Sequence, residues 1–308
     1  MLTNKATRGI VCAALGGIFW GFSGACGQFL FNWYSVDPLW ISAVRMMGAA
    51  PILMLLCLAR SSWRSSLVNM WKKPKDVLQL ILSTIFGMCF VQIAYLVAIS
   101  YSNAATATVL QYSGPVMVVL VVCLLGRRAP TLKEVLAMIS VVLGVFILAT
   151  HGNPGNLALS PEGIVWGLLA AVGVVFYTLL PSSLMWRFGS MPVLAWCMTL
   201  SAIVTVSAVQ PWNGMPNLDV VGWVAVGAMI VVGTVGGFAF YLQGVNDAGA
   251  SKASLVSSVE TVSATAFAVL WLGTSFRSMD FVGFIFIMIT VFLLHHREEP
   301  GQVESSQL

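Results

Sequence analysis

Long apolar stretches, separated by short polar breaks, run through almost the whole chain. A helix needs about 20 mostly apolar residues to cross the hydrocarbon core of a bilayer. The pattern therefore predicts ten transmembrane helices, near residues 9–31, 39–59, 77–100, 104–126, 132–150, 163–186, 191–210, 220–244, 252–273 and 280–296. The third and fourth share one uncharged run from Val77 to Gly126, and the polar turn at 100–103 separates them. Because the apolar runs are continuous and do not alternate, a transmembrane β-barrel is excluded.

The composition points to the same class of protein. Hydrophobic residues make up 58% of the 308 residues and charged residues only 8%, whereas a soluble domain carries roughly a quarter charged residues. The six cysteines all fall in apolar stretches at irregular spacing, which favours buried apolar side chains over disulfides or metal ligands. The sequence has no phosphate-binding loop or nucleotide motif, so we expect no metal and no cofactor.

The basic residues are unevenly distributed between the two ends of the predicted helices. If the N-terminus is cytoplasmic, the cytoplasmic segments hold Lys5, Arg8, Arg60, Arg64, Lys72, Lys73, Lys75, Arg127, Arg128, Lys133, Arg187, Lys252 and Arg297. The other side holds only Arg277, and Arg45 lies within the second helix. Such a bias sets topology through the positive-inside rule. We therefore expect a multi-pass protein of the cytoplasmic (inner) membrane with both termini in the cytoplasm, and no nucleic-acid partner.

The two halves of the chain resemble each other. Gly9-Ile10-Val11 recurs as Gly163-Ile164-Val165, and Pro38 recurs as Pro192 at the same separation. Five helices per half is an odd number, so the second half must be inverted relative to the first. The sequence thus predicts an all-α polytopic membrane protein, with ten transmembrane helices as two inverted five-helix repeats and a site near the bilayer midplane. The predicted units are residues 1–150 and 151–297, followed by a polar disordered tail at 298–308.

Several short motifs carry a resemblance to a known family. They are Trp20-Gly21, Arg45, Ser113-Gly114-Pro115, Ala250-Ser251-Lys252-Ala253-Ser254-Leu255, Ser258-Val259-Glu260-Thr261 and Leu272-Gly273. With these motifs the chain resembles an EamA-type member of the drug/metabolite transporter superfamily, a group that includes bacterial amino-acid and metabolite exporters. The resemblance implies a ten-helix bundle whose central cavity is lined mainly by the first, third, fourth, sixth, eighth and ninth helices. It also implies export or exchange of small metabolites.

Glu260 is the only charged residue between Ala253 and Phe276. A carboxylate inside the bilayer is costly and marks a substrate or ion pathway by default. It can bind a cation or carry a proton there. At 100° per residue, Ser257 and Trp271 share its helix face and join it as candidate site residues. The alternative is a structural role, in which Glu260 caps a broken helix or pairs with a basic residue.

Arg45 follows Pro38 by about two helical turns and therefore lies within the predicted second helix. Its guanidinium can attract an anionic group such as a substrate carboxylate. It can equally extend to the membrane surface or fix a loop. The sequence leaves both interpretations open.

Uncharged polar and aromatic residues inside the predicted helices form a second set of candidates. They are Trp20, Gln92, Tyr95, Gln111, Tyr112, Tyr177, Phe240 and Tyr241. As a wall facing one cavity, these side chains would orient a small ligand. Aromatic rings opposite a carboxylate suit an organic cation or the ammonium group of an amino acid. Each residue taken alone is explained as well by helix packing or interface anchoring.

The function predicted from these features is secondary transport of small metabolites, amino acids or similar zwitterions and amines, outward by alternating access. The expected partners are a small-molecule substrate, the lipid bilayer and, as an option, protons, with the chain as a monomer or homodimer. One alternative is an organic-cation or drug exporter, and another is a non-transporting membrane scaffold subunit. Gly21-Phe22-Ser23-Gly24 mimics an intramembrane serine protease motif, but no histidine base falls in a predicted membrane interior. We therefore expect no enzyme.

Overall fold

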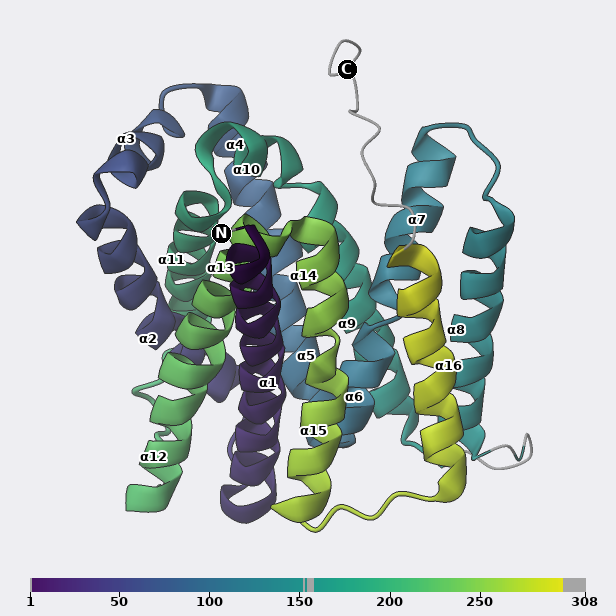
Figure 1. Cartoon of the computed structure of the whole chain (residues 1–308). Helices are drawn as coiled ribbons and strands as arrows, with labels where there is room; N and C mark the ends of the chain where they lie inside the picture. Colours follow the sequence, from purple (N-terminus) through teal and green to yellow (C-terminus); the bar gives the residue numbers. More distant parts are fainter. Residues whose placement is uncertain (1, 152, 154–157, 296–308) are drawn as a thin grey trace.

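The computed structural model describes residues 2–151, 153 and 158–295, and this part of the chain is helical with turns and no strands. The first half contains α1 (Leu2–Tyr34), α2 (Pro38–Ala59), α3 (Ser61–Asn69), α4 (Pro74–Leu82), η1 (Ser83–Cys89), α5 (Phe90–Tyr101), α6 (Ala104–Gln111), α7 (Gly114–Leu125) and α8 (Leu132–Thr150). The second contains α9 (Pro161–Leu179), α10 (Ser182–Phe188), α11 (Ser190–Val209), α12 (Val220–Ala228), η2 (Met229–Gly236), α13 (Gly237–Ala248), α14 (Ala250–Ser257), α15 (Val259–Leu270) and α16 (Ser278–His295). The helices stand side by side in one bundle (Figure 1).

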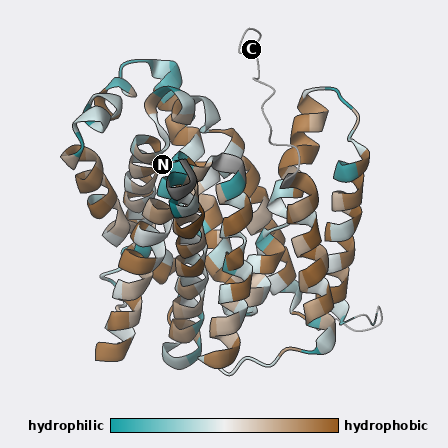
Figure 2. Ribbon diagram, viewed as in Figure 1, coloured by the Kyte–Doolittle hydropathy of each residue, from teal (hydrophilic) through white to brown (hydrophobic). Residues whose placement is uncertain are grey.

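The predicted transmembrane helices are confirmed within a few residues at most of their ends. In the described residues, nine helical units are long and apolar enough to cross a membrane, and the apolar helix Ser278–Leu294 is slightly shorter. Large apolar side chains such as Leu55, Leu125 and Leu270 are exposed on the outside of the bundle. Figure 2 shows hydrophobic residues along the outer helices from end to end. Such a surface fits lipid rather than water.

Helix starts follow local capping chemistry. Asp37 precedes α2 and accepts hydrogen bonds from the amides of Leu39 and Trp40. Thr131 and Glu134 form a capping box at the start of α8. Prolines occupy the first turns of α2, α4 and α9, where a missing amide hydrogen costs nothing.

The fourth and ninth membrane units are broken in the middle. α6 ends at Gln111 and α7 begins at Gly114, where Pro115 removes a donor. α14 ends at Ser257 and α15 begins at Val259, so the ninth helix is not continuous as the pattern suggested. The hydroxyl of Ser257 donates to the carbonyl of Ser254 (2.9 Å), which offers the backbone an alternative to regular helical bonding.

The third and eighth membrane units each contain a π-helical segment. In both, a nine-residue α-helix precedes the π segment and a twelve-residue α-helix follows it. This shared succession, with the shared break in the next unit, fits the predicted repeat. The first turn of α1 and the last turns of α16 lie at the same end of the bundle (Figure 1). The unit boundaries at 150 and 297 stay predictions, and the tail at 298–308 lies outside the described residues.

α1 packs closely against α13 on one side and against α14 and α15 on the other (Figure 1). A Cβ atom placed at Gly17 would lie 2.4 Å from the carbonyl oxygen of Ser257. One placed at Gly237 would lie 2.5 Å from the indole nitrogen of Trp20. The absence of side chains at these glycines therefore brings α1 into contact with α13 and with the α14–α15 break. This packing positions the cavity described next.

Candidate functional site

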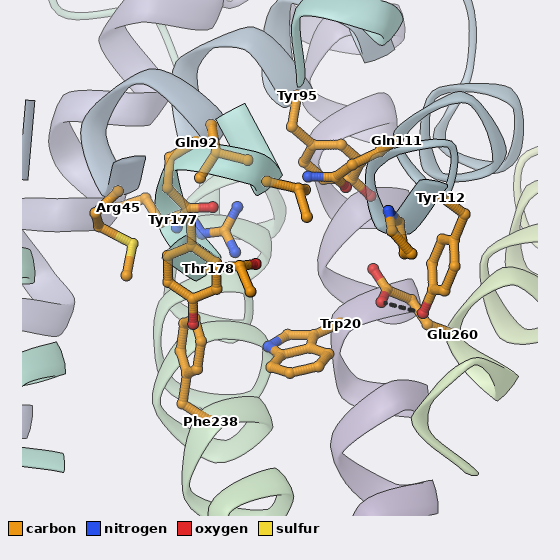
Figure 3. A pocket seen from close by; sticks show the side chains of 14 residues that line it. Trp20, Arg45, Gln92, Tyr95, Gln111, Tyr112, Tyr177, Thr178, Phe238 and Glu260 are labelled. Carbon is orange, nitrogen blue, oxygen red and sulfur yellow. Dashed lines mark hydrogen bonds between the residues drawn. The ribbon is translucent and has the colours of Figure 1, made fainter. Parts of the chain in front are cut away.

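A cavity of ≈ 220 Å³ lies inside the bundle. Of the twelve residues predicted for the site, eight line it, namely Trp20, Arg45, Gln92, Tyr95, Gln111, Tyr112, Tyr177 and Glu260 (Figure 3). They come from the first, third, fourth, sixth and ninth membrane units that the family resemblance implies, and Arg45 adds the second. The other lining residues are Met88, Val91, Pro115, Val174, Thr178 and Phe238. Of these, Phe238 comes from the eighth unit.

Glu260 lies in the first turn of α15, directly after the break in the ninth unit. Its Oε2 accepts a hydrogen bond from the hydroxyl of Tyr112 (3.1 Å), which stands at the break in the fourth unit. The same hydroxyl lies 3.5 Å from the carbonyl oxygen of Ser257. The two broken helices therefore meet at the carboxylate. In the described part of the chain Glu260 forms no ion pair with Arg45 or Lys252.

Arg45 is buried, with 4% of its surface exposed, and its guanidinium lies inside the bundle rather than at the membrane surface. Its Nε donates to Oγ1 of Thr234 (2.7 Å). Thr234 belongs to the π-helical segment η2, and its hydroxyl in turn donates to the carbonyl of Met229 (3.1 Å). Figure 3 shows Arg45 and Glu260 on opposite sides of the cavity, so two opposite charges face the same space.

Aromatic side chains supply much of the remaining wall. The Trp20 ring lies 5.3 Å from that of Phe238 in an edge-to-face arrangement and 5.1 Å from that of Tyr241. The hydroxyl of Tyr95 shares a 2.8 Å hydrogen bond with Oγ1 of Thr108. Aromatic faces close to a carboxylate form an environment that attracts cationic groups.

Four predicted residues do not line the cavity. Tyr241 lies behind Trp20, while Phe240 packs against Phe19 with ring centroids 5.5 Å apart. Trp271 is 42% exposed and stacks on Phe29 at 5.3 Å. Ser257 offers its backbone carbonyl to Tyr112, but its hydroxyl bonds its own helix. The break before Glu260 and the π segment before Phe240 both change which residues share a helix face.

Two residues that the sequence interpretation did not select matter to the site. Phe238 lines the cavity, and its position three residues before Tyr241 was the available signal. Thr234 orients Arg45, and nothing in its apolar surroundings identified it. Three or more metal-ligating side chains do not cluster anywhere in the described residues. The charged, hydrogen-bonding and aromatic side chains that line the cavity can hold a small organic molecule.

The two ends of the cavity have different surroundings. Tyr177 and Thr178 line it close to the end of α9, which lies on the side of the chain termini, and Tyr177 is half-buried while Thr178 is exposed. Toward the other side, Gln28 joins three segments. Its Oε1 accepts from the amide of Ala104 (2.9 Å), and its Nε2 donates to Oγ1 of Thr274 (2.9 Å). Gln28 is only 3% exposed, so these contacts are buried.

Comparisons with known proteins agree with this architecture. A protein named "Uncharacterized inner membrane transporter YicL" from Salmonella typhimurium is 30% identical over 94% of this chain and 96% of its own length. "Uncharacterized transporter YyaM" from Bacillus subtilis is 20% identical over 89% of both chains. A protein of known crystal structure superposes with a TM-score of 0.62 over 94% of this chain and 99% of its own, at 19% identity, which shows the shared fold.

The sequence profile of the EamA-like transporter family matches residues 7–150 and 161–295, which together make up most of the chain. The match falls once on each half, as the repeated succession of helices leads one to expect. The relatives named above carry the same assignment as transporters. The chain is therefore a multi-pass membrane transporter and belongs to the EamA-like transporter family.

Proposed function

We propose that this transporter moves small amine-bearing metabolites, amino acids and similar zwitterions among them, outward across the cytoplasmic membrane. The observation that carries the proposal is the Glu260 carboxylate, which lines a membrane-interior cavity together with Trp20 and Phe238. A carboxylate beside aromatic rings recognises an ammonium group by charge attraction and by cation–π contact. The uncharged amides of Gln92 and Gln111 add hydrogen-bonding groups for the rest of the molecule.

Alternating access is the mechanism that this geometry favours. The cavity is lined by Tyr177 and Thr178 toward the side of the termini, while Gln28 links α1 to α6 and to Thr274 toward the other side. Release on that far side requires the contacts of Gln28 to break and the opposite end to close. The two broken helices meet at the site, as in transporters whose discontinuous helices hold the substrate near the bilayer midplane. Glu260 can then serve in two ways, by binding the substrate ammonium or by carrying a proton on the return step.

The proposal is tested by uptake and counterflow in proteoliposomes, with and without a pH gradient. Labelled amino acids and quaternary ammonium compounds are the probes, and the variant is Glu260→Gln. We expect the wild type to transport amino acids and the variant to lose most of this flux. Glu162→Gln is the matched control, because Glu162 is exposed in the first turn of α9 and does not line the cavity.

Each result separates the competing functions. Flux that follows the pH gradient in the wild type but not in Glu260→Gln identifies Glu260 as a proton carrier. Flux that does not depend on the pH gradient but is lower in Glu260→Gln than in the wild type identifies Glu260 as a substrate ligand only. Transport of quaternary ammonium compounds without amino acids favours the organic-cation exporter, for which the aromatic wall and single carboxylate also argue. Folded protein that transports no probe contradicts the proposal and favours a scaffold role.

A further inference from the structure

Two buried hydrogen-bond donors in the cavity have no acceptor. Nη1 of Arg45 and Nε2 of Gln92 make no hydrogen bond within the described residues. Arg45 is 4% exposed and Gln92 is 9% exposed, so both side chains are at least nine-tenths buried. Both line the same cavity and lie on the same side of it in Figure 3.

Leaving such donors unpaired is costly. Buried polar side-chain atoms in folded proteins nearly always have a partner. The cost is larger in an apolar membrane interior, and larger again for a charged group. A charge-assisted hydrogen bond is about twice as strong as a neutral one, so an anionic acceptor is the partner that stabilises Arg45 most.

We propose that Arg45 and Gln92 form an anion-binding subsite that takes the carboxylate of the transported molecule. This inference rests on the proposed function and names the second polar group of its substrate. The ammonium group then lies across the cavity at Glu260, next to Trp20. A substrate with both groups satisfies both poles, whereas a simple amine leaves Arg45 and Gln92 unpaired.

The guanidinium is held in a fixed orientation for this task. Thr234 accepts from Nε of Arg45 and leaves Nη1 directed away from that contact. The hydroxyl of Thr234 is itself fixed by its bond to the carbonyl of Met229, five residues earlier in the π segment. π segments of this kind occur frequently at functional sites. Thr234 is therefore a positioning residue for the subsite.

The spacing of the two charges supports an occupant between them. Within the described residues they form no direct ion pair, so each charge is open to a ligand. The cavity of ≈ 220 Å³ is far larger than one water molecule needs. Two opposite charges that would attract each other in a collapsed site are thus kept apart by a space of ligand size.

The test is direct binding to the purified full chain, measured by the shift in Tm that each ligand causes. Three pools are compared: the standard L-amino acids, the amines that lack their carboxylate, and the acids that lack their amine. For the wild type we expect the amino acids to bind at least about tenfold more tightly than the amines, since they add charge-assisted hydrogen bonds. Titration of single members of the best pool then gives the ratio of Kd values.

Variants locate the subsite. Gln92→Glu places a negative charge beside the proposed carboxylate and should abolish the preference for amino acids over amines. Gln92→Met removes the hydrogen-bond donor without adding charge and should also reduce the preference for amino acids over amines. Gln210→Glu adds the same charge at an exposed position away from the cavity and should leave the preference unchanged. The Tm without ligand reports whether each variant folds.

The outcomes distinguish this inference from the proposed function. If amines and amino acids bind the wild type equally well, or if both Gln92 variants keep the preference, the subsite is refuted while recognition of amines stands. If acids bind and amines do not, the result supports the anion-binding subsite and refutes ammonium binding at Glu260. If no pool shifts the Tm of folded wild type, both proposals are refuted for this class of substrate.

Discussion

Single charged residues inside apolar runs were the most informative positions of the sequence. Glu260 could be predicted as a site residue and Arg45 as a possible one, because a charge at such depth demands a special environment. Their partners could not, since Tyr112 reaches Glu260 and Thr234 reaches Arg45 across 148 and 189 residues of sequence. A hydroxyl group in an apolar helix carries no signal of the distant side chain that it contacts.

Asp219, at the end of the bundle opposite the chain termini, provides a residue-scale prediction. Its Oδ1 accepts hydrogen bonds from the hydroxyl of Tyr34 (2.5 Å) and from the amide of Gly222 (2.8 Å). These bonds, that of Tyr34 foremost, hold the pKa of Asp219 below its ordinary value of 3.8. The contribution of the charge to stability is therefore present above the pKa of the unfolded chain and is lost as pH falls through the lower pKa of the folded state.

Asp219→Asn keeps a good helix cap but removes this charge. We expect the variant to be less stable than the wild type at neutral pH, with the difference shrinking as pH falls below 3.8. Thermal unfolding in detergent across this range measures the difference. Tyr34→Phe should likewise reduce the change in protein stability between neutral pH and pH 3.8, because it removes the main hydrogen bond to the Asp219 carboxylate. A difference between wild type and Asp219→Asn that does not change with pH would contradict the role of the charge.

At the scale of the helix, the close approach of α1 and α15 depends on Gly21. A Cβ atom there would lie 2.7 Å from the backbone nitrogen of Ala264 and 2.8 Å from the carbonyl oxygen of Glu260. Because backbone atoms cannot rotate away, Gly21→Ala should push α15 outward and move Glu260 with it. We expect a loss of stability of about 1–3 kcal/mol from overpacking, together with reduced transport.

Gly227 in α12 is the matched control, because a Cβ atom there meets nothing within 4 Å. Gly227→Ala should stabilise the protein by roughly 0.5–1 kcal/mol, since alanine restricts the unfolded chain and favours the helix. Thermal unfolding and proteoliposome flux are measured for both variants. If the two substitutions change stability and flux equally, the close contact between α1 and α15 is not needed to position Glu260.

The helices themselves could be predicted well, but their irregularities could not. Apolar length and polar turns located the ends of most membrane units, because the bilayer imposes one dominant constraint. The π segments η1 and η2 are stabilised by packing against other helices, and their sequences contain no local break such as proline. Each π segment rotates the residues that follow it. The aromatic residue chosen from the sequence for this part of the wall was Phe240, whereas the structure places Phe238 there.

At the scale of the whole molecule, most basic residues lie at one end of the bundle. Arg8 pairs with Asp247 (2.8 Å), Arg187 with Asp76 (2.8 Å), and Arg128 with Glu134 (2.9 Å). All three pairs lie where helices begin or end on the side of the chain termini. In each pair the arginine side chain reaches solvent, whereas the carboxylate side chain is only 3%, 4% or 6% exposed. The position of the pairs agrees with the excess of basic residues that predicts which side faces the cytoplasm.

The predicted orientation is testable by thiol labelling in intact bacterial cells. After replacement of the six native cysteines, one cysteine is introduced at Arg64 in α3 or at Asn213 in the loop before α12, since both positions are exposed on opposite sides of the bundle. A membrane-impermeant maleimide should label Asn213→Cys in intact cells and Arg64→Cys only after permeabilisation. The reverse pattern would place the termini outside. The cavity residues Tyr177 and Thr178, which lie toward the termini, would then lie on the outer side, and the proposed sequence of binding inside and release outside would be contradicted.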